Sequence, residues 1–221
     1  ATASDRRIFF FFSQSGGVMQ RMLGVLLGLC LCALCLTAAA KTTATTTQSK
    51  QSMTDAPVIQ AMFSPEDDVQ SEIVHVLGRA KKTIHVQAYL LTNNVITNAL
   101  IAAHQRGVKV RVLLDNQLAF TAAGSDVGAL QASGIVVKLE TAYDNAHNKV
   151  MLIDVGEPSS VLITGSYNFT VAAQRKNAEN ILFIRQAPNL LKQYLSNWLS
   201  HEKNAKIYTG TNLAPANKKR F

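Results

Sequence analysis

The chain has 221 residues, which is enough for one ordinary domain with flanking segments. Its 22 basic and 14 acidic side chains give a formal charge of +8, which favours a polyanionic partner or a membrane surface without choosing between them. The three cysteines, Cys30, Cys32 and Cys35, all lie in one apolar run. The rest of the chain therefore has neither a disulfide framework nor a cysteine-based metal site.

The N-terminal part of the sequence is typical of a targeting segment. Residues 1–18 are an upstream extension of uncertain status, and Met19 is the natural start. A basic residue, an apolar core and small residues just before Lys41 then predict a secretory signal peptide over 19–40. This leader predicts a periplasmic or secreted bacterial protein. The alternative is a membrane-anchored protein, because an uncleaved apolar core almost reaches the length that spans a bilayer.

A single folded domain is expected over 56–209. It follows a stretch over 41–55 that is rich in Thr, Ser and Gln, which predicts a disordered linker, and it precedes a polar basic tail over 210–221. Period-two and β-branched runs predict strands over 58–63, 83–90, 108–114, 135–139, 147–154, 160–164, 179–184 and 206–208.

Helices are expected between these strands. Ser64 followed by Pro65 and two acids predicts an N-cap and a first helical turn. The predicted helices run from there to about 80 and over 93–106, 126–132 and 188–201. Strand and helix alternate through the first half, which predicts an α/β fold with a mixed β-sheet flanked by helices on both faces.

The polar residues of greatest interest stand at the ends of two predicted strands. His147 and Lys149 fall on one face of the first strand, roughly 6.6 Å apart at two residues' spacing, and Asp154 falls on the opposite face. Ser166 and Asn168 follow the second strand. An imidazole, an ammonium, a hydroxyl and an amide that converge in this way suit a phosphate group better than any other ligand.

Two further features bear on this site. Glu179 stands at the start of a later strand, where a carboxylate can hold an imidazole in one tautomer. His201 and Lys203 repeat the His-x-Lys spacing, but they lie at a helix end, and we interpret them as a solvated helix terminus. Taken singly, each of these residues has an ordinary structural explanation, and it is the joint pattern that indicates function.

The pattern resembles the signature of the phospholipase D superfamily over about Pro57 to Trp198. The single copy of the motif makes it most similar to small bacterial secreted endonucleases of that superfamily, which implies a phospholipase D-like nuclease domain over 56–209. The motif residues are His147-x-Lys149-x4-Asp154 and Gly165-Ser166-x-Asn168.

The resemblance also implies roles for individual residues. His147 would attack phosphorus and form a phosphohistidine. Lys149, Ser166 and Asn168 would bind the phosphoryl oxygens, and Glu179 would orient a histidine. We expect a structural role for Asp154, because strand alternation points it away from His147.

The predicted function is a metal-independent, sequence-nonspecific endonuclease that acts on DNA, with RNA as an open second substrate. No metal and no cofactor is expected, because lysines and amides supply the electrostatic stabilisation. The alternatives are a phospholipase D-type lipid phosphodiesterase and a noncatalytic nucleic-acid-binding protein. A membrane partner is expected only if the leader is uncleaved.

The chemistry needs a nucleophile and also an acid for the leaving oxygen, and one motif supplies one histidine. The resemblance implies a homodimer with a shared active site, in which a second His147 is the acid. The separation between Asp154 and Gly165 is longer than is usual in the family, and 156–160 predicts a longer turn. A register shift there would turn Ser166 and Asn168 away from His147.

Overall fold

The computed structural model describes residues 56–210. These residues form one eight-stranded sheet in the order β1-β7-β6-β5-β2-β3-β4-β8. The strands are β1 Val58–Ser64, β2 Thr83–Ala88, β3 Lys109–Asp115, β4 Val136–Glu140, β5 Lys149–Ile153, β6 Val161–Gly165, β7 Glu179–Arg185 and β8 Lys206–Ile207. The helices are α1 Val69–Arg79, α2 Asn94–Gln105, α3 Leu118–Thr121, α4 Val127–Ala132, α5 Val171–Arg175 and α6 Pro188–Asn204.

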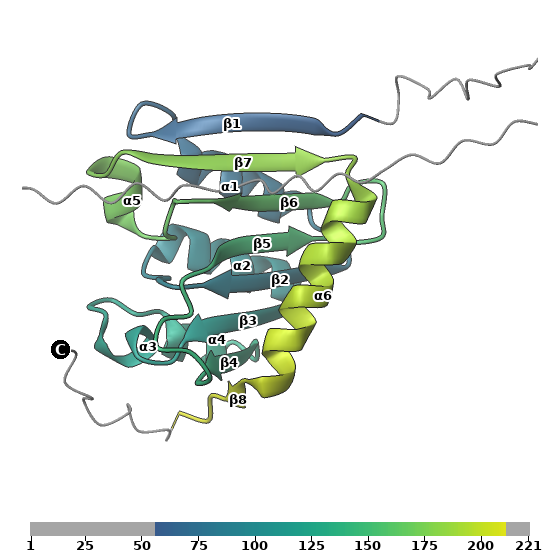
Figure 1. Cartoon of the computed structure of the whole chain (residues 1–221). Helices are drawn as coiled ribbons and strands as arrows, with labels where there is room; N and C mark the ends of the chain where they lie inside the picture. Colours follow the sequence, from purple (N-terminus) through teal and green to yellow (C-terminus); the bar gives the residue numbers. More distant parts are fainter. Residues whose placement is uncertain (1–55, 211–221) are drawn as a thin grey trace, which may run out of the picture. The chain divides into compact units, whose positions relative to one another are not determined.

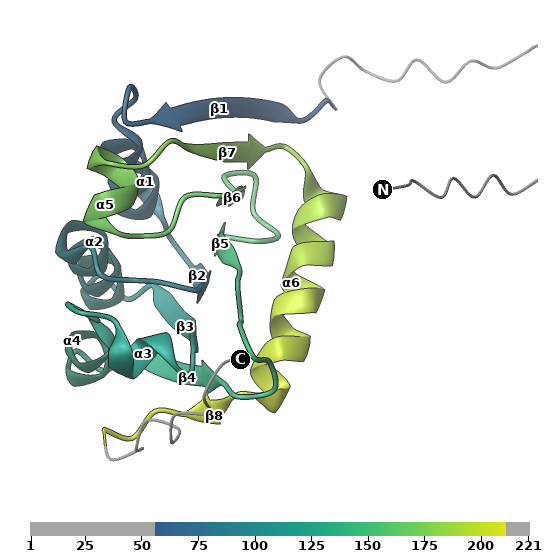
Figure 2. The ribbon, with the colours of Figure 1, turned by 60° about the vertical axis from the view of Figure 1, so that its left-hand side comes forward.

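The sheet is mixed. The pairs β2–β3 and β3–β4 are parallel, whereas the other five pairs are antiparallel. Helices α1, α2 and α4 cover one face and α6 crosses the other, as Figures 1 and 2 show. The predicted α/β fold with helices on both faces is therefore confirmed.

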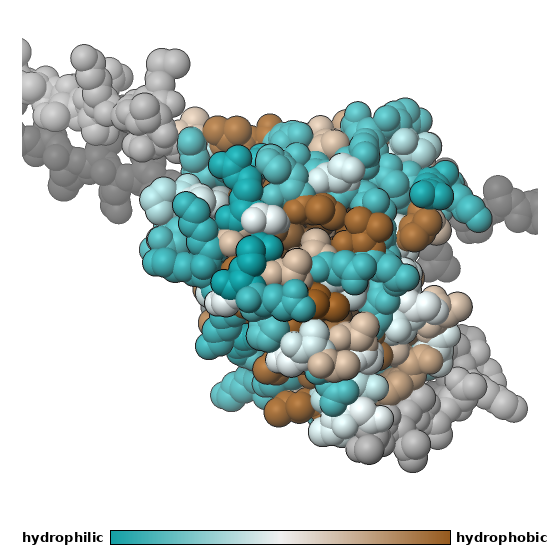
Figure 3. Space-filling view, turned by 180° about the vertical axis from the view of Figure 1, so that it is seen from behind, coloured by the Kyte–Doolittle hydropathy of each residue, from teal (hydrophilic) through white to brown (hydrophobic). Residues whose placement is uncertain are grey.

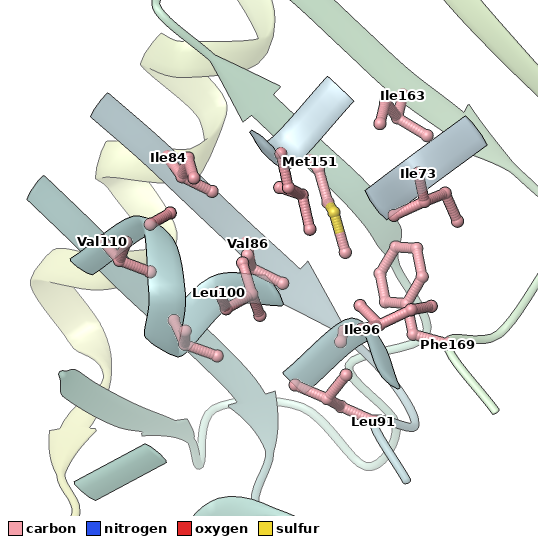
Figure 4. Packing of buried hydrophobic residues seen from close by; sticks show 14 of the residues in the cluster. Ile73, Ile84, Val86, Leu91, Ile96, Leu100, Val110, Met151, Ile163 and Phe169 are labelled. Atoms are coloured by element: carbon pink, nitrogen blue, oxygen red, sulfur yellow. The ribbon is translucent and has the colours of Figure 1, made fainter. Parts of the chain in front are cut away.

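Each face of the sheet has its own apolar core. On the side of α1 and α2, Ile73 and Leu100 lie opposite Val86 and Met151 of the central strands, and all four are buried (Figure 4). On the other side, Trp198 of α6 is 1% exposed and its Nε1 donates to the Val86 carbonyl oxygen at 3.0 Å. A buried indole N–H needs such a partner, and this bond fixes α6 on the centre of the sheet.

The structure corrects the predicted start of the first helix. Ser64 is the last residue of β1, and its hydroxyl donates to the Ala173 carbonyl oxygen at 2.6 Å. Asp68 is the N-cap instead, because its side chain accepts from the Ser71 backbone N–H at 3.1 Å. The hydrogen bonds that Asp68 accepts from the hydroxyl and from the backbone N–H of Ser71 also lower its pKa. Helix α1 therefore begins at Val69, one turn later than proline at the first position would suggest.

Two short helices, α3 and α5, were not predicted. Each has at most five residues, which is too short to show helical periodicity in the sequence. The strand expected over 83–90 ends at Ala88, and the strand expected from 147 begins at Lys149.

The predicted leader, linker and most of the predicted tail lie outside the described residues. Within 56–210, no helix is long and apolar enough to cross a bilayer. Seen from behind, the face that carries α1 and α2 is largely hydrophilic, with hydrophobic residues in smaller groups between (Figure 3).

Candidate active site

Four neighbouring strands end or begin at the same edge of the sheet. Strands β7, β6, β5 and β2 are adjacent in this order, and each is antiparallel to the next. The starts of β7 and β5 therefore meet the ends of β6 and β2, at the left edge of the sheet in Figure 1. This edge collects Glu179, the segment after Gly165, Lys149 and the residue after Ala88.

His147 lies just before β5 and is exposed, whereas Lys149 opens β5 and is 7% exposed. Lys149 Nζ lies 3.1 Å from Nδ1 and 3.3 Å from Nε2 of His147, and it donates to the His147 carbonyl oxygen at 3.1 Å. An ammonium donates only to a ring nitrogen that carries no proton, so this contact suits an imidazole with a free lone pair.

The side chain of Tyr89 packs against both of these residues. Its ring centroid lies 4.3 Å from that of His147, and Lys149 Nζ lies 5.0 Å from the Tyr89 ring centroid. The backbone N–H of Tyr89 donates to the Asn148 carbonyl oxygen at 2.8 Å, so the pairing of β2 with β5 continues up to the site. Tyr89 therefore limits where the imidazole and the ammonium can move.

Lys149 is held between two opposing electrostatic influences. Burial lowers the pKa of its ammonium, and the charge of Glu179 raises it. The net shift of the pKa is downward. The Glu179 carboxylate thus acts on the Lys149 ammonium from across β6.

Ser166 and Glu179 form the second half of the site. The Ser166 hydroxyl donates to Glu179 Oε2 at 2.6 Å and accepts from the Asn180 backbone N–H at 3.0 Å. Asn177 Nδ2 donates to Glu179 Oε1 at 2.9 Å. Within the described chain Glu179 makes no hydrogen bond to His147, and its side-chain partners are Ser166 and Asn177.

Gly165 is required by the close approach of β7. A Cβ atom at this position would lie 2.3 Å from the Asn180 carbonyl oxygen and 2.8 Å from Ile181 Cα, both backbone atoms. Strands β5 and β6 form a regular antiparallel hairpin from Ile153↔Val161 to Val150↔Thr164. The longer turn at 156–160 is thus absorbed at the far end of the hairpin, and Ser166 lies beside Glu179 at the edge where Lys149 begins β5.

Asn168 is partly buried, and its Oδ1 is buried without a hydrogen-bond partner among the described residues. Its neighbours Tyr167 and Phe169 are 1% and 0% exposed and anchor the segment in the core. The Phe169 backbone N–H donates to the Leu90 carbonyl oxygen at 3.1 Å. These contacts hold the backbone on either side of Asn168 in the core.

Asp154 lies at the opposite end of β5 from Lys149. Its carboxylate is buried and accepts backbone N–H groups of Lys81, Lys82 and Thr83 at 2.9, 2.7 and 2.9 Å. Its own backbone has φ of +50°, in the left-handed region. Asp154 thus ties the turn before β2 to the end of β5.

The comparisons with known proteins agree with this geometry. The family model described as "Cardiolipin synthase, PLD-like domain" matches residues 73–202, which is more than half of the chain. The chain belongs to the phospholipase D superfamily. A phospholipase D from Rickettsia typhi is 39% identical to it over 150 residues, which cover 68% of this chain and 71% of that protein. The protein is accordingly a phosphodiesterase of the phospholipase D superfamily.

Other members of the superfamily are also similar to it. A mitochondrial cardiolipin hydrolase from Xenopus tropicalis is 33% identical over 116 residues, which cover 52% of this chain and 53% of that protein. Among solved structures, the phospholipase D family member Nuc from Salmonella typhimurium is 30% identical, with a TM-score of 0.63, and the match covers 69% of this chain and 99% of Nuc. The sheet and its flanking helices are thus the phospholipase D fold.

The structure changes our interpretation of His201. We expected a solvated helix terminus, but the His201 side chain is 14% exposed and its Nδ1 lies 2.5 Å from Glu140 Oε1. Its ring also stacks on Tyr143. The sequence gives no sign of this contact, because Glu140 and His201 lie 61 residues apart in the chain.

Tyr89 is the functional-site residue that sequence reasoning missed in this phosphodiesterase. Only the pairing of β2 with β5, which joins Ala88 to Lys149, brings it beside the motif. An aromatic residue directly after a buried β-branched strand is the one available signal, and it is not specific. Among residues 56–210, no group of three or more His, Cys, Asp or Glu side chains has an arrangement that holds a metal.

Proposed function

We propose that this phosphodiesterase is an endonuclease that cleaves nucleic acid through a phosphohistidine on His147. The imidazole is exposed, so a phosphodiester can reach it from solvent. Attack by a ring nitrogen forms a nitrogen–phosphorus bond, and the bond between phosphorus and the leaving oxygen breaks. Water then hydrolyses the phosphohistidine and restores the imidazole.

The neighbouring residues supply charge stabilisation in this proposal. Lys149 places its ammonium beside the attacking ring and stabilises the negative charge on the phosphoryl oxygens. Ser166 and the Nδ2 group of Asn168 provide further hydrogen bonds in this proposal. These groups supply the stabilisation that a metal ion gives in other phosphodiesterases, so we propose that cleavage is metal-independent and requires no cofactor.

The observation that favours a nucleic-acid substrate is an exposed polar segment with two basic residues, just before β7. Arg175, Lys176 and Asn177 are all exposed and directly precede Glu179, and Ser166 is exposed beside them. Contacts between basic side chains and phosphates provide most of the sequence-independent affinity for nucleic acid. A long polyanion is attracted to such a surface through the phosphates on either side of the one that is cleaved.

A lipid phosphodiesterase is the second candidate, and two observations favour it. Curated relatives of the chain are named phospholipase D and mitochondrial cardiolipin hydrolase. In addition, Val95 and Val171 are 49% and 45% exposed, and both lie close in sequence to the Leu91–Phe169 bridge near the site. Exposed apolar residues beside an active site are one way for an enzyme to rest on a membrane surface.

We further propose that two copies of the chain form one shared site. The leaving oxygen needs a proton, and among the described residues His147 is the motif's only histidine. Its exposed position leaves room for a second subunit, whose own His147 is the acid in this proposal. This second imidazole gives its proton to the leaving oxygen and then takes a proton from the water that hydrolyses the phosphohistidine.

The test is an assay on plasmid DNA and on phosphatidylcholine micelles, with and without excess EDTA. We expect plasmid nicking that persists in EDTA and disappears in His147→Ala, whereas His75→Ala leaves it unchanged. His75 is a suitable control because it is exposed on α1 and contacts Glu72, away from the site. Turnover of the lipid alone would refute the nuclease and favour the second candidate.

A further inference from the structure

Of the aromatic residues near the motif, Tyr143 has the most exposed side chain, and Tyr89 is partly buried. Tyr167 and Phe169 are 1% and 0% exposed and belong to the core, whereas Tyr143 is 49% exposed. It lies in the connection between β4 and β5, four residues before His147. A large aromatic side chain that remains exposed next to an active site is a candidate contact for the substrate.

The buried side of Tyr143 is firmly supported. Its ring stacks on His201 with centroids 5.0 Å apart and an interplanar angle of 26°. His201 is in turn held by Glu140, which is 2% exposed, through the 2.5 Å contact of Nδ1 with Oε1. Gln87 Nε2 donates to both Glu140 oxygens at 3.1 Å, so the carboxylate itself is fixed on β2.

The segment between Tyr143 and His147 is also tethered. The Ala146 backbone N–H donates to Asp115 Oδ2 at 2.9 Å, and the Tyr89 hydroxyl donates to Asn145 Oδ1 at 3.3 Å. Four residues span at most about 14 Å, which corresponds to about four nucleotide steps of a duplex strand. A base stacked on Tyr143 therefore belongs to a nucleotide close to the phosphate at His147.

We propose that the open face of Tyr143 is a stacking subsite for a nucleobase that flanks the scissile phosphate. The proposal rests on the nucleic-acid substrate proposed above and adds the group that would hold a base. Every nucleobase has a flat π-face, so stacking on a tyrosine ring tolerates any sequence. His201 and Glu140 are then positioning residues, because they act on the substrate only through the orientation of Tyr143.

The test measures kcat/KM for cleavage of a single-stranded oligonucleotide. A stacked base contributes about 1 to 3 kcal/mol, so Tyr143→Leu is expected to lower kcat/KM about tenfold or more, mainly through KM. Tyr143→Phe keeps the flat ring and is expected to retain wild-type values. On a matched oligonucleotide that carries abasic residues around the cleaved bond, wild type and Tyr143→Leu are expected to cleave equally well.

A second variant tests the support beneath the ring. His201→Ala keeps the tyrosine at position 143 but removes the ring on which it stacks. The value of kcat/KM should therefore fall on the normal oligonucleotide and not on the abasic one. A thermal melt of each variant shows whether it is folded. Equal cleavage of the normal oligonucleotide by wild type and Tyr143→Leu would overturn the subsite, and so would an equal loss on both oligonucleotides. If wild type cleaves no nucleic acid at all, the proposed function fails and the subsite with it.

Discussion

The carboxylate of Asp154 is a member of the motif whose hydrogen bonds all go to the backbone. Three N–H groups at the start of β2 converge on it, and they come from Lys81, Lys82 and Thr83. Charged acceptors of this kind form the stronger class of hydrogen bonds, and their removal leaves buried donors without a partner.

We therefore expect Asp154→Ala to lower the free energy of unfolding by about 3 kcal/mol. Asp154→Asn should cost less, because asparagine tolerates the left-handed backbone and keeps one acceptor oxygen. Chemical denaturation of both variants measures this, with Glu66→Ala as a control at an exposed carboxylate. An unchanged free energy of unfolding in Asp154→Ala would contradict the structural role.

Lys149 sets the expected behaviour of the enzyme at alkaline pH. Its ammonium is the charged form that binds phosphate, and burial lowers its pKa below the usual 10.5. Activity should therefore begin to fall, as pH rises, at a lower pH than an exposed lysine would give. In Lys149→Arg the guanidinium stays charged, so the alkaline limb of kcat/KM should move to higher pH even if the maximum is reduced.

His85 predicts a change of stability with pH that is independent of catalysis. It is buried against Trp198, its Nδ1 has no hydrogen-bond partner among the described residues, and burial lowers its pKa to about 4. Between pH 6.5 and 4 the unfolded chain therefore binds a proton that the folded chain does not bind, so stability falls as the pH falls.

The expected loss is on the order of 3 kcal/mol across this range of pH. Denaturation curves at several pH values measure it, and His85→Gln should remove most of the slope. His75→Gln is the comparison, because it makes the same replacement at an exposed histidine.

At the scale of elements, the close pairing of β6 with β7 at Gly165 decides the position of Ser166. Gly165→Ala would bring a methyl group against the Asn180 carbonyl oxygen at 2.3 Å, which the backbone can relieve only by moving the strands apart. We expect a lower melting temperature and a loss of kcat of tenfold or more, because a small displacement of Ser166 disturbs the phosphate contacts. Gly128→Ala is the control, since its Cβ position is open.

The sequence predicted most elements because their burial follows simple periodicity. Strand β5 is buried along its length and is a continuous apolar run after Lys149, whereas β2 and the first half of β3 alternate apolar with polar residues. The start of α1 was misplaced because Ser64-Pro65 imitates a cap, whereas the later Asp68 makes the capping hydrogen bond. Local patterns of this kind cannot show which of two nearby caps forms.

The site was predictable only as far as its residues are close in sequence. His147, Lys149 and Ser166 stand at strand ends that one hairpin joins, so their convergence follows from alternation and pairing. Tyr89 and the Glu140–His201 pair depend on contacts between residues about 60 apart, which no local pattern contains.

At the scale of the whole molecule, the shared site predicts how mixed dimers behave. If each site needs His147 from both subunits, a dimer of wild type and His147→Ala is inactive. After the two forms are unfolded together and refolded, activity should fall as the square of the wild-type fraction. A linear fall, or a mass in solution that corresponds to an active monomer, would contradict the shared site.

The pairing of β1 with β7 has a consequence for how the chain folds. In the described sheet β1 lies at the edge and pairs with β7 alone, so Val58 finds its partner Arg185 only after nearly the whole domain has been synthesised. Contacts between residues so far apart form slowly, because a long loop must close first. We expect β1 to stay unpaired while the ribosome adds all the residues between it and β7, which begins at Glu179. Until then the sheet beside His147 and Lys149 is incomplete. We expect hydrolysis to start only once β7, which carries Glu179, has paired with β6 and β1.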